Sequence, residues 1–368
     1  MSKAEVGMSN TTSGGIQNDE ELFQEAHNLL AVEDIDEAEQ ICRRILERGS
    51  SRAKASNLAG CIASKRGAYD EAIDWWKKAR RQNPGYVAPV INTAALYMRT
   101  LDSPSKALKA CDRAILKIGD DKNGHFELLA CKAAALLLLH RTRKVLDVVD
   151  EMEKLGVGSP DVFVDLGDDA MQEDALDEAE AAYSAALRLE PENAEAIHGM
   201  GLLCYLCNDR IGCETYWLRS LEHEASKPPP PWHLPKHEFE AIADEVLLEL
   251  SQRERTLLGS TTIVVLDVPS SEDVKNGHDP RIGGMLCGVS NEVQGITDPS
   301  SSEPRVFKLY QRIVEASCES SEEVFDEIGK ILMLELMTKV MSEDERQDTL
   351  LRAVAASHGV FIHRPSDE

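Results

Sequence analysis

A small or apolar residue recurs about every 34 positions through residues 19–223, and no other pattern in the sequence limits the fold as strongly. This residue opens the second half of six segments that share one layout: Ala38, Ala72, Ala107, Val145, Ala179 and Cys213. Successive spacings are 34, 35, 38, 34 and 34 residues. Self-similarity at such a period indicates a repeat architecture, in which each unit must bury its apolar faces against its neighbours.

Each segment predicts a hairpin of two amphipathic helices. The clearest covers 163–191, with the sequence FVDLGDDAMQEDALDEAEAAYSAALRLEP. Gly60, Gly167 and Gly201 fall where one helix must approach its partner closely, because a larger side chain would push the two apart. We therefore expect a mainly α fold with an array of about six hairpins over 19–223.

This layout resembles the tetratricopeptide-repeat (TPR) family, whose repeat is 34 residues long. The resemblance implies a solenoid whose first helices line a concave groove that holds a peptide or partner protein. Carried over by register, the groove-facing positions are Lys54, Asn57, Lys65, Asn92 and Arg99. Asn can pair with a peptide backbone, and Lys or Arg can bind a carboxylate. The alternative is that all five are ordinary solvated residues on charged helix faces.

A proline-rich segment ends the repeats. Four consecutive prolines lie within residues 224–236, which predicts an extended linker and a domain boundary. A spacer is favoured over a proline-motif ligand for another protein. The pattern then predicts a small α+β domain over 237–345. Its expected elements are a helix at 238–253, strands at 261–268, 283–290 and 305–310, a loop at 270–281 and a helix at 322–341.

The order of these pieces resembles the small bacterial zincin-like metallopeptidase family. The matching segments are HEFEAI (237–242), VVLDVP (264–269), MLCG (285–288), VFKLYQR (306–312) and IGKILMLELMT (328–338). The family carries an HExxH helix, in which two His bind Zn²⁺ and the Glu is the general base. Here Leu334 and Thr338 stand at the His positions, and Glu335 aligns with the base. The resemblance therefore implies a degenerate motif that binds no metal, with Glu335 as a relic of catalysis.

The charge and cysteine content of the chain limit the classes of partner and site that it can have. The net charge of −25 disfavours nonspecific binding to nucleic acid or to anionic membranes, because both repel an acidic chain. Nine scattered cysteines favour reduced thiols in a cytoplasmic protein over a disulfide framework. Cys204, Cys207 and Cys213 are interpreted as buried thiols, with a zinc or redox site as the alternative. His27, His125, His140 and His198 show no ligand spacing, so they are expected to be structural or surface residues.

These observations favour an interaction protein, a TPR scaffold or adaptor joined to an inactive peptidase-like domain, with no cofactor. One alternative is an active zinc metallopeptidase whose repeats recruit substrates, and another is a chaperone-like binder. Residues 1–18 are expected to be disordered, without a signal peptide. The tail 346–368 is expected to pack on the second domain, with a partner-binding tail as the alternative. The sequence does not specify the partner or the oligomeric state.

Overall fold

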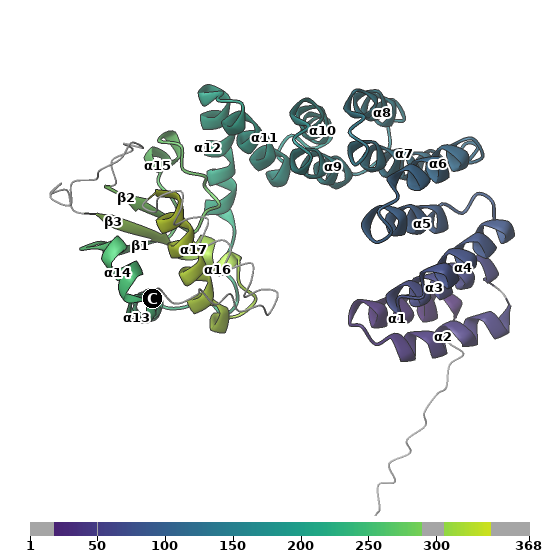
Figure 1. The fold of residues 1–368 in the computed structure, drawn as a ribbon, viewed down its shortest axis with the longest axis horizontal. Helices are drawn as coiled ribbons and strands as arrows, with labels where there is room; N and C mark the ends of the chain where they lie inside the picture. Colours follow the sequence, from purple (N-terminus) through teal and green to yellow (C-terminus); the bar gives the residue numbers. More distant parts are fainter. Residues whose placement is uncertain (1–17, 50, 289–304, 340–368) are drawn as a thin grey trace, which may run out of the picture. The chain divides into compact units, whose positions relative to one another are not determined.

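The computed structural model describes residues 18–49, 51–288 and 305–339 (Figure 1). It divides into two compact units, with the division between Asn193 and Ala194. Residues 1–17 of the expected disordered N-terminus and the whole expected tail 346–368 lie outside the described residues.

The described part of the first unit consists of helices that pack as successive pairs. They are α1 (Asp19–Ala31), α2 (Ile35–Arg48), α3 (Arg52–Lys65), α4 (Tyr69–Gln82), α5 (Ala88–Arg99), α6 (Pro104–Ile115), α7 (Lys122–Leu137), α8 (Thr142–Lys154), α9 (Pro160–Gln172) and α10 (Leu176–Leu189). Each odd-numbered helix packs on the helix that follows it, and α3, α5, α7 and α9 also contact one another in order. The sixth pair, α11 (Ala194–Leu206) and α12 (Arg210–Ser226), belongs to the second unit.

The residues with the 34-residue spacing lie at buried positions of the second helices. Ala38, Ala72, Ala107, Val145 and Ala179 are fully buried, and Cys213 is buried. The prediction of helical hairpins is thereby confirmed, and the spaced residues are buried on the second helix of each pair.

Three hairpins share one glycine–aromatic contact between their helices. A methyl group added at Gly60 would lie 2.4 Å from Trp76, at Gly167 it would lie 2.5 Å from Tyr183, and at Gly201 it would lie 2.2 Å from Trp217. In each hairpin the aromatic ring of the second helix thus fills the space that a side chain on the first helix would need. This contact is the physical reason for glycine at these positions.

The second unit continues from α12 into a small α+β arrangement. Its further elements are α13 (Lys236–Glu249), α14 (Gln252–Leu258), β1 (Thr262–Leu266), α15 (Ser271–Lys275), β2 (Gly284–Cys287), β3 (Val306–Tyr310), α16 (Gln311–Ala316), a 3₁₀ turn at Ser321–Glu323 and α17 (Val324–Lys339). The sheet has the order β1-β3-β2, with β1 parallel and β2 antiparallel to β3. Helix α17 packs on β2 and α13 (Figure 1).

The core of this unit lies between the sheet and the helices α13 and α17. Phe239 and Phe307 are fully buried, as are Ile328 and Leu336 on the inner face of α17. These side chains form one apolar cluster. The predicted strands and the long C-terminal helix are therefore confirmed as the elements that build it.

Two element predictions fail locally. The helix expected at 238–253 breaks at Leu250, because Ser251 begins a new helix with a capping box to Glu254. The expected loop 270–281 contains α15, which Ser270 and Asp273 cap in the same way. Both short helices follow from local capping rather than from a long apolar period.

The proline-rich segment is held at its end. Trp232 and Leu234 pack against the core of the second unit. The fully buried carboxylate of Glu315 accepts a hydrogen bond from the Leu234 backbone N–H at 3.2 Å and lies 2.6 Å from Nδ1 of His233. The last part of the segment is thus fixed to the α+β elements of the same unit, so the boundary between the two units lies before the last hairpin instead of at the prolines.

Candidate functional site

Two places in the described residues gather the side chains that the sequence singles out. One is the face of the first helices in the first unit, and the other is a hollow in the second unit.

On the first-helix face, Asn57 and Asn92 join α3 to α5. The Asn92 Nδ2 group donates to Asn57 Oδ1 at 3.0 Å and also lies 3.4 Å from the sulfur of Cys61. Asn57 is buried, and its backbone carbonyl accepts the indole N–H of Trp76 at 3.2 Å. The sequence placed both asparagines on one face from register alone, and the structure brings them into contact.

Lys54 lies one helical turn before Asn57. Its ammonium group is 2.9 Å from the carboxylate of Glu20 on α1 and lies 5.8 Å from the centre of the Phe23 ring. Both charged side chains are more than half exposed, so an incoming carboxylate can exchange with Glu20 at little cost.

Arg99 ends α5, and Lys65 ends α3; both are exposed. Surrounding atoms raise the pKa of Asp169 on α9 by desolvation, and the nearby charge of Arg99 opposes that rise. The same guanidinium favours the thiolate of Cys131 on α7, whose pKa is lowered chiefly by its hydrogen bond with Cys111. The charge of Arg99 therefore favours the ionised forms of Cys131 on α7 and Asp169 on α9. Lys65 makes no ion pair with any described residue.

In the second unit a hollow of about 860 Å³ is lined from α11, α12, α15, the sheet and α17. Glu335 and Thr338 both line it. The carboxylate of Glu335 accepts the backbone N–H of Leu286 on β2 at 2.6 Å, and only 8% of Glu335 is exposed. The Thr338 hydroxyl donates to the carbonyl of Leu334 within its own helix at 2.9 Å. Leu334 itself is 52% exposed and is not among the residues that line the hollow.

Asp273 organises the polar side of this hollow, and sequence reasoning missed it. Lys308 on β3 lies 2.6 Å from one carboxylate oxygen, and the Tyr310 and Ser270 hydroxyls donate to the other at 3.2 and 2.7 Å. Burial opposes ionisation of Asp273, but Lys308 and Ser270 outweigh it and lower its pKa. The signal available in the sequence was the Ser-x-x-Asp capping box, which positions Asp273 on a five-residue helix.

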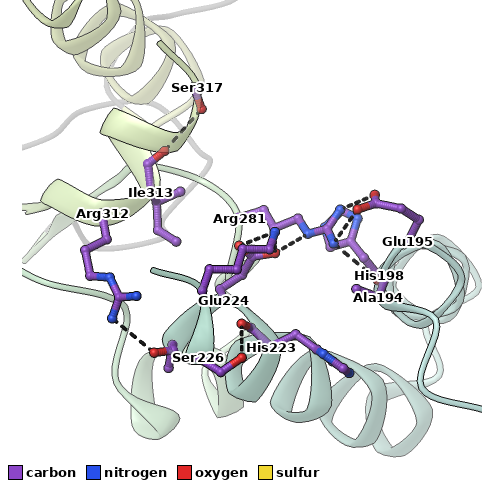
Figure 2. A network of polar contacts seen from close by, with 12 residues as sticks. Ala194, Glu195, His198, His223, Glu224, Ser226, Arg281, Arg312, Ile313 and Ser317 are labelled. Atoms are coloured by element: carbon purple, nitrogen blue, oxygen red, sulfur yellow. Dashed lines mark hydrogen bonds and ion pairs between the residues drawn. The ribbon is translucent and has the colours of Figure 1, made fainter. Parts of the chain in front are cut away.

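The last hairpin is tied to the α+β elements by charged residues (Figure 2). Arg281 donates to Glu195 on α11 at 2.5 Å and to Glu224 on α12 at 2.8 Å. His198 on α11 lies 2.9 Å from Asp279. Its side chain is partly buried there, in keeping with the structural role expected for it. The loop between α15 and β2 therefore holds α11 and α12 in place.

The three cysteines interpreted as buried thiols differ in exposure, and Cys204 is half-buried. No disulfide joins any of the nine, all of which lie in described residues. Cys213 is buried, but Cys207 is exposed, because it follows the end of α11 instead of lying on its packed face. Within the described ranges, no group of three or more His, Cys, Asp or Glu has an arrangement that could hold a metal ion. The described helices also include none that is long and apolar enough to cross a lipid bilayer.

Comparison with known proteins identifies the repeats. Residues 23–87 and 164–205 match the model of the tetratricopeptide repeat. The chain carries tetratricopeptide repeats. The matched residues run from within α1 past the end of α4 and from within α9 into α11, and the hairpins α5–α6 and α7–α8 lie outside them. No curated protein matches the sequence.

Solved structures with some likeness to the chain include TPR proteins and a pilus factor. The type IV pilus biogenesis factor PilW has a TM-score of 0.44 and 13% identity, over 58% of this chain and 96% of that one. A thermophilic TPR protein of Thermus thermophilus has a TM-score of 0.38 and 19% identity, over 49% and 95%. YrrB, described as a TPR protein with an unusual peptide-binding site, has a TM-score of 0.32 and 21% identity, over 49% and 91%.

Proposed function

We propose that this chain is an interaction scaffold, and that the face of the first helices in its first unit binds a peptide or a segment of a partner protein. The TPR hairpins support this proposal, since such repeats present successive first helices along one side. In this unit α3, α5, α7 and α9 contact one another in that order.

The observation that carries the proposal is the Asn57–Asn92 contact between α3 and α5. An asparagine side chain offers two donors and an acceptor with two lone pairs, so a pair of them has hydrogen-bonding capacity beyond the bond that they share. Asn57 is buried, so the capacity open to a ligand lies on the half-buried Asn92, whose amide oxygen can accept a backbone N–H of an extended peptide. The pair is held in register by the packing of Trp76 beneath Asn57.

The charges along this face give the bound segment a direction. Lys54, Lys65 and Arg99 are exposed cations on α3 and α5, whereas Asp161 and Asp165 are exposed acids on α9. An acidic part of the partner is therefore expected over α3 and α5, with basic residues toward α9.

Affinity purification with quantitative mass spectrometry tests this proposal. The wild-type chain is compared with Lys54→Glu/Arg99→Glu and with the control Lys144→Glu, an exposed cation on the second helix α8. We expect a partner that wild type and the control retain equally and that the double variant loses by about tenfold or more, since each charge-assisted hydrogen bond is worth about 1.5–3 kcal/mol. Equal recovery of every partner by all three proteins would contradict the proposed face.

For the second unit we propose a recognition or regulatory role without peptidase activity, in a degenerate zincin-like domain. Its support is that Glu335, aligned with the general base, is engaged by the Leu286 backbone N–H, and that position 334 holds an exposed leucine. A catalytic zinc site needs about three protein ligands, and two of the aligned positions are occupied by Leu334 and Thr338. The alternative, an active zinc metallopeptidase with substrate-recruiting repeats, predicts stoichiometric metal.

Zinc content of the purified chain separates these alternatives. We expect well below one Zn²⁺ per chain and no cleavage of peptides, whereas about one Zn²⁺ with cleavage would establish the enzyme. The variant Leu334→His/Thr338→His tests the resemblance itself, because restored imidazoles at i and i+4 should bring back zinc uptake. A well-folded variant that takes up no zinc would contradict the alignment.

The proposed setting is the cytoplasm. Its support is the cysteine pattern of the sequence, since nine cysteines are odd in number and scattered, unlike the disulfide framework of a secreted protein.

A further inference from the structure

The first unit has a second charged surface, formed by α4, α5 and α6 and distinct from the first-helix face. It is a hollow of about 410 Å³ whose lining includes no acidic residue. Six cations surround it: Lys77, Arg80, Lys106, Lys109, Arg113 and Lys117. In a chain of net charge −25, such a concentration of positive charge is unexpected from composition alone.

The helical register explains how the cations converge. Lys77 and Arg80 are three positions apart on α4, and Lys106, Lys109 and Arg113 follow at the i, i+3 and i+7 positions of α6, so each set lies on one side of its helix. Ile73, Tyr97 and Ala110 supply apolar lining between the two rows. The ammonium group of Lys106 lies 5.4 Å from the centre of the Tyr97 ring.

Most of this charge is not neutralised by the protein. Lys77 pairs with Asp74 at 2.9 Å, and both side chains are mostly exposed. The other five cations form no ion pair with any residue that the structure describes. Like charges gathered around a hollow repel one another and raise the local potential, and an anionic occupant relieves that repulsion.

We propose that this basic hollow, defined by the six cations, is a second binding site that takes an acidic peptide segment. Lys106 to Arg113 span seven residues of helix, or about 10 Å at 1.5 Å per residue. This length corresponds to about three residues of extended chain, so a run of about four to six Asp or Glu residues covers the row. Carboxylates accept charge-assisted hydrogen bonds from both Lys and Arg.

The charge of the whole chain favours a short peptide over a long polyanion. At physiological ionic strength, charges are screened over about 8 Å, so a short acidic peptide responds mainly to the basic hollow. A nucleic acid or an anionic membrane extends beyond the hollow and meets the acidic surface of the rest of the chain. The site is independent of the proposed first-helix face, because no residue of one belongs to the other.

Fluorescence anisotropy with a labelled hexaglutamate peptide tests the site on the full-length chain. We expect saturable binding that weakens with added salt, and a Kd at least about tenfold higher for Lys109→Glu/Arg113→Glu, because two attractive charges become repulsive. Lys109→Gln/Arg113→Gln should give a smaller loss in the same direction. The control Arg143→Glu/Lys144→Glu, on exposed positions of α8, makes the same change in net charge and should bind as wild type.

Two further measurements make the result decisive. In the background of Lys54→Glu/Arg99→Glu, the further change Lys109→Glu/Arg113→Glu should still raise the Kd for hexaglutamate at least about tenfold, so a failure of the first-helix proposal leaves this one standing. Circular dichroism establishes that each variant is folded. No saturable binding, equal loss in the α8 control, or tighter binding to a short single-stranded DNA or to phosphatidylserine vesicles than to hexaglutamate would each overturn the proposal.

Discussion

At the scale of single residues, the repeats depend on contacts in which an aromatic ring of the second helix fills the space that a glycine leaves on the first helix. Gly60, Gly167 and Gly201 each face an aromatic ring sixteen positions later in the chain. Because interiors are close-packed, an added side chain at these positions must displace the ring or separate the helices. The same spacing in three hairpins shows that the repeat is a packing unit as well as a sequence pattern.

Gly167→Leu tests this contact. We expect the substitution to lower the free energy of unfolding by about 1–3 kcal/mol, since the leucine side chain overlaps the Tyr183 ring. Urea unfolding followed by circular dichroism measures the change. Gly329→Ala in α17 is the control, because a methyl group there meets nothing within 4 Å. That control should be neutral or stabilising by up to about 1 kcal/mol, through the higher helix propensity of alanine; an unchanged Gly167→Leu protein would refute the repeat register.

Glu335 offers a second test at this scale. Glu335→Gln keeps an oxygen that can accept the Leu286 backbone N–H, so we expect little change in stability and no change in any binding function. Glu335→Leu removes that acceptor and should cost about 1–3 kcal/mol. Thermal unfolding compares the two. Loss of function in a folded Glu335→Gln protein would instead show that the carboxylate has a chemical role.

At the scale of elements, the sequence predicts the helices and strands that arise from a periodic or local residue pattern. Helix positions in the repeats follow from the 34-residue spacing, and β1, β2 and β3 follow from runs of β-branched and apolar residues. The strand order β1-β3-β2 does not follow, because the β1–β3 pairing joins distant segments, with Thr262 opposite Val306. The break between α13 and α14 depends on one capping residue, Ser251. The period of the apolar residues alone predicts a single helix over 238–253.

The residues of the candidate site could likewise be predicted only where they follow a local or periodic pattern. Register alone placed Asn57 and Asn92 together, because residues on successive first helices share a face. Arg281 lay in an expected loop, and its partner Glu195 is 86 positions away, so no local signal identified the contact. Asp273 was missed for the same reason, since Lys308 is 35 positions away.

The Arg281 cluster predicts how the stability of the second unit depends on pH. Hydrogen bonding from Arg281 lowers the pKa of Glu195. Burial opposes ionisation of Asp279, but His198 outweighs it and lowers that pKa as well. A carboxylate whose pKa is lower in the folded state contributes stability that is fully present above its unfolded value, about 4, and is lost as the pH falls through the folded value.

Comparing the wild type with Arg281→Gln by urea unfolding at neutral pH and at about pH 3, below the usual carboxylate pKa, measures this contribution. We expect the variant to be less stable at neutral pH, and the difference between the two proteins to shrink in acid, where Glu195 becomes protonated. A difference that stayed constant, or grew on acidification, would show that Arg281 acts through packing instead of charge.

At the scale of the whole molecule, function is carried by surfaces that differ in charge. The chain has a net charge of −25, yet the exposed cations of α3 and α5 and the basic hollow of α4–α6 are both positive. In an acidic protein such regions focus attraction on acidic segments of a partner, and the surrounding charge disfavours extended polyanions. The second unit carries its own polar hollow around Asp273 and Glu335.

Titration calorimetry with the shortest binding peptide of a captured partner tests most directly whether the first-helix face does the binding. For Lys54→Glu/Arg99→Glu we predict a Kd at least about tenfold above that of the wild type, since each lost charge-assisted hydrogen bond is worth about 1.5–3 kcal/mol. We also predict that the peptide is recovered intact after incubation with wild type. An unchanged Kd in the double variant, or cleavage of the peptide by wild type, would contradict the account.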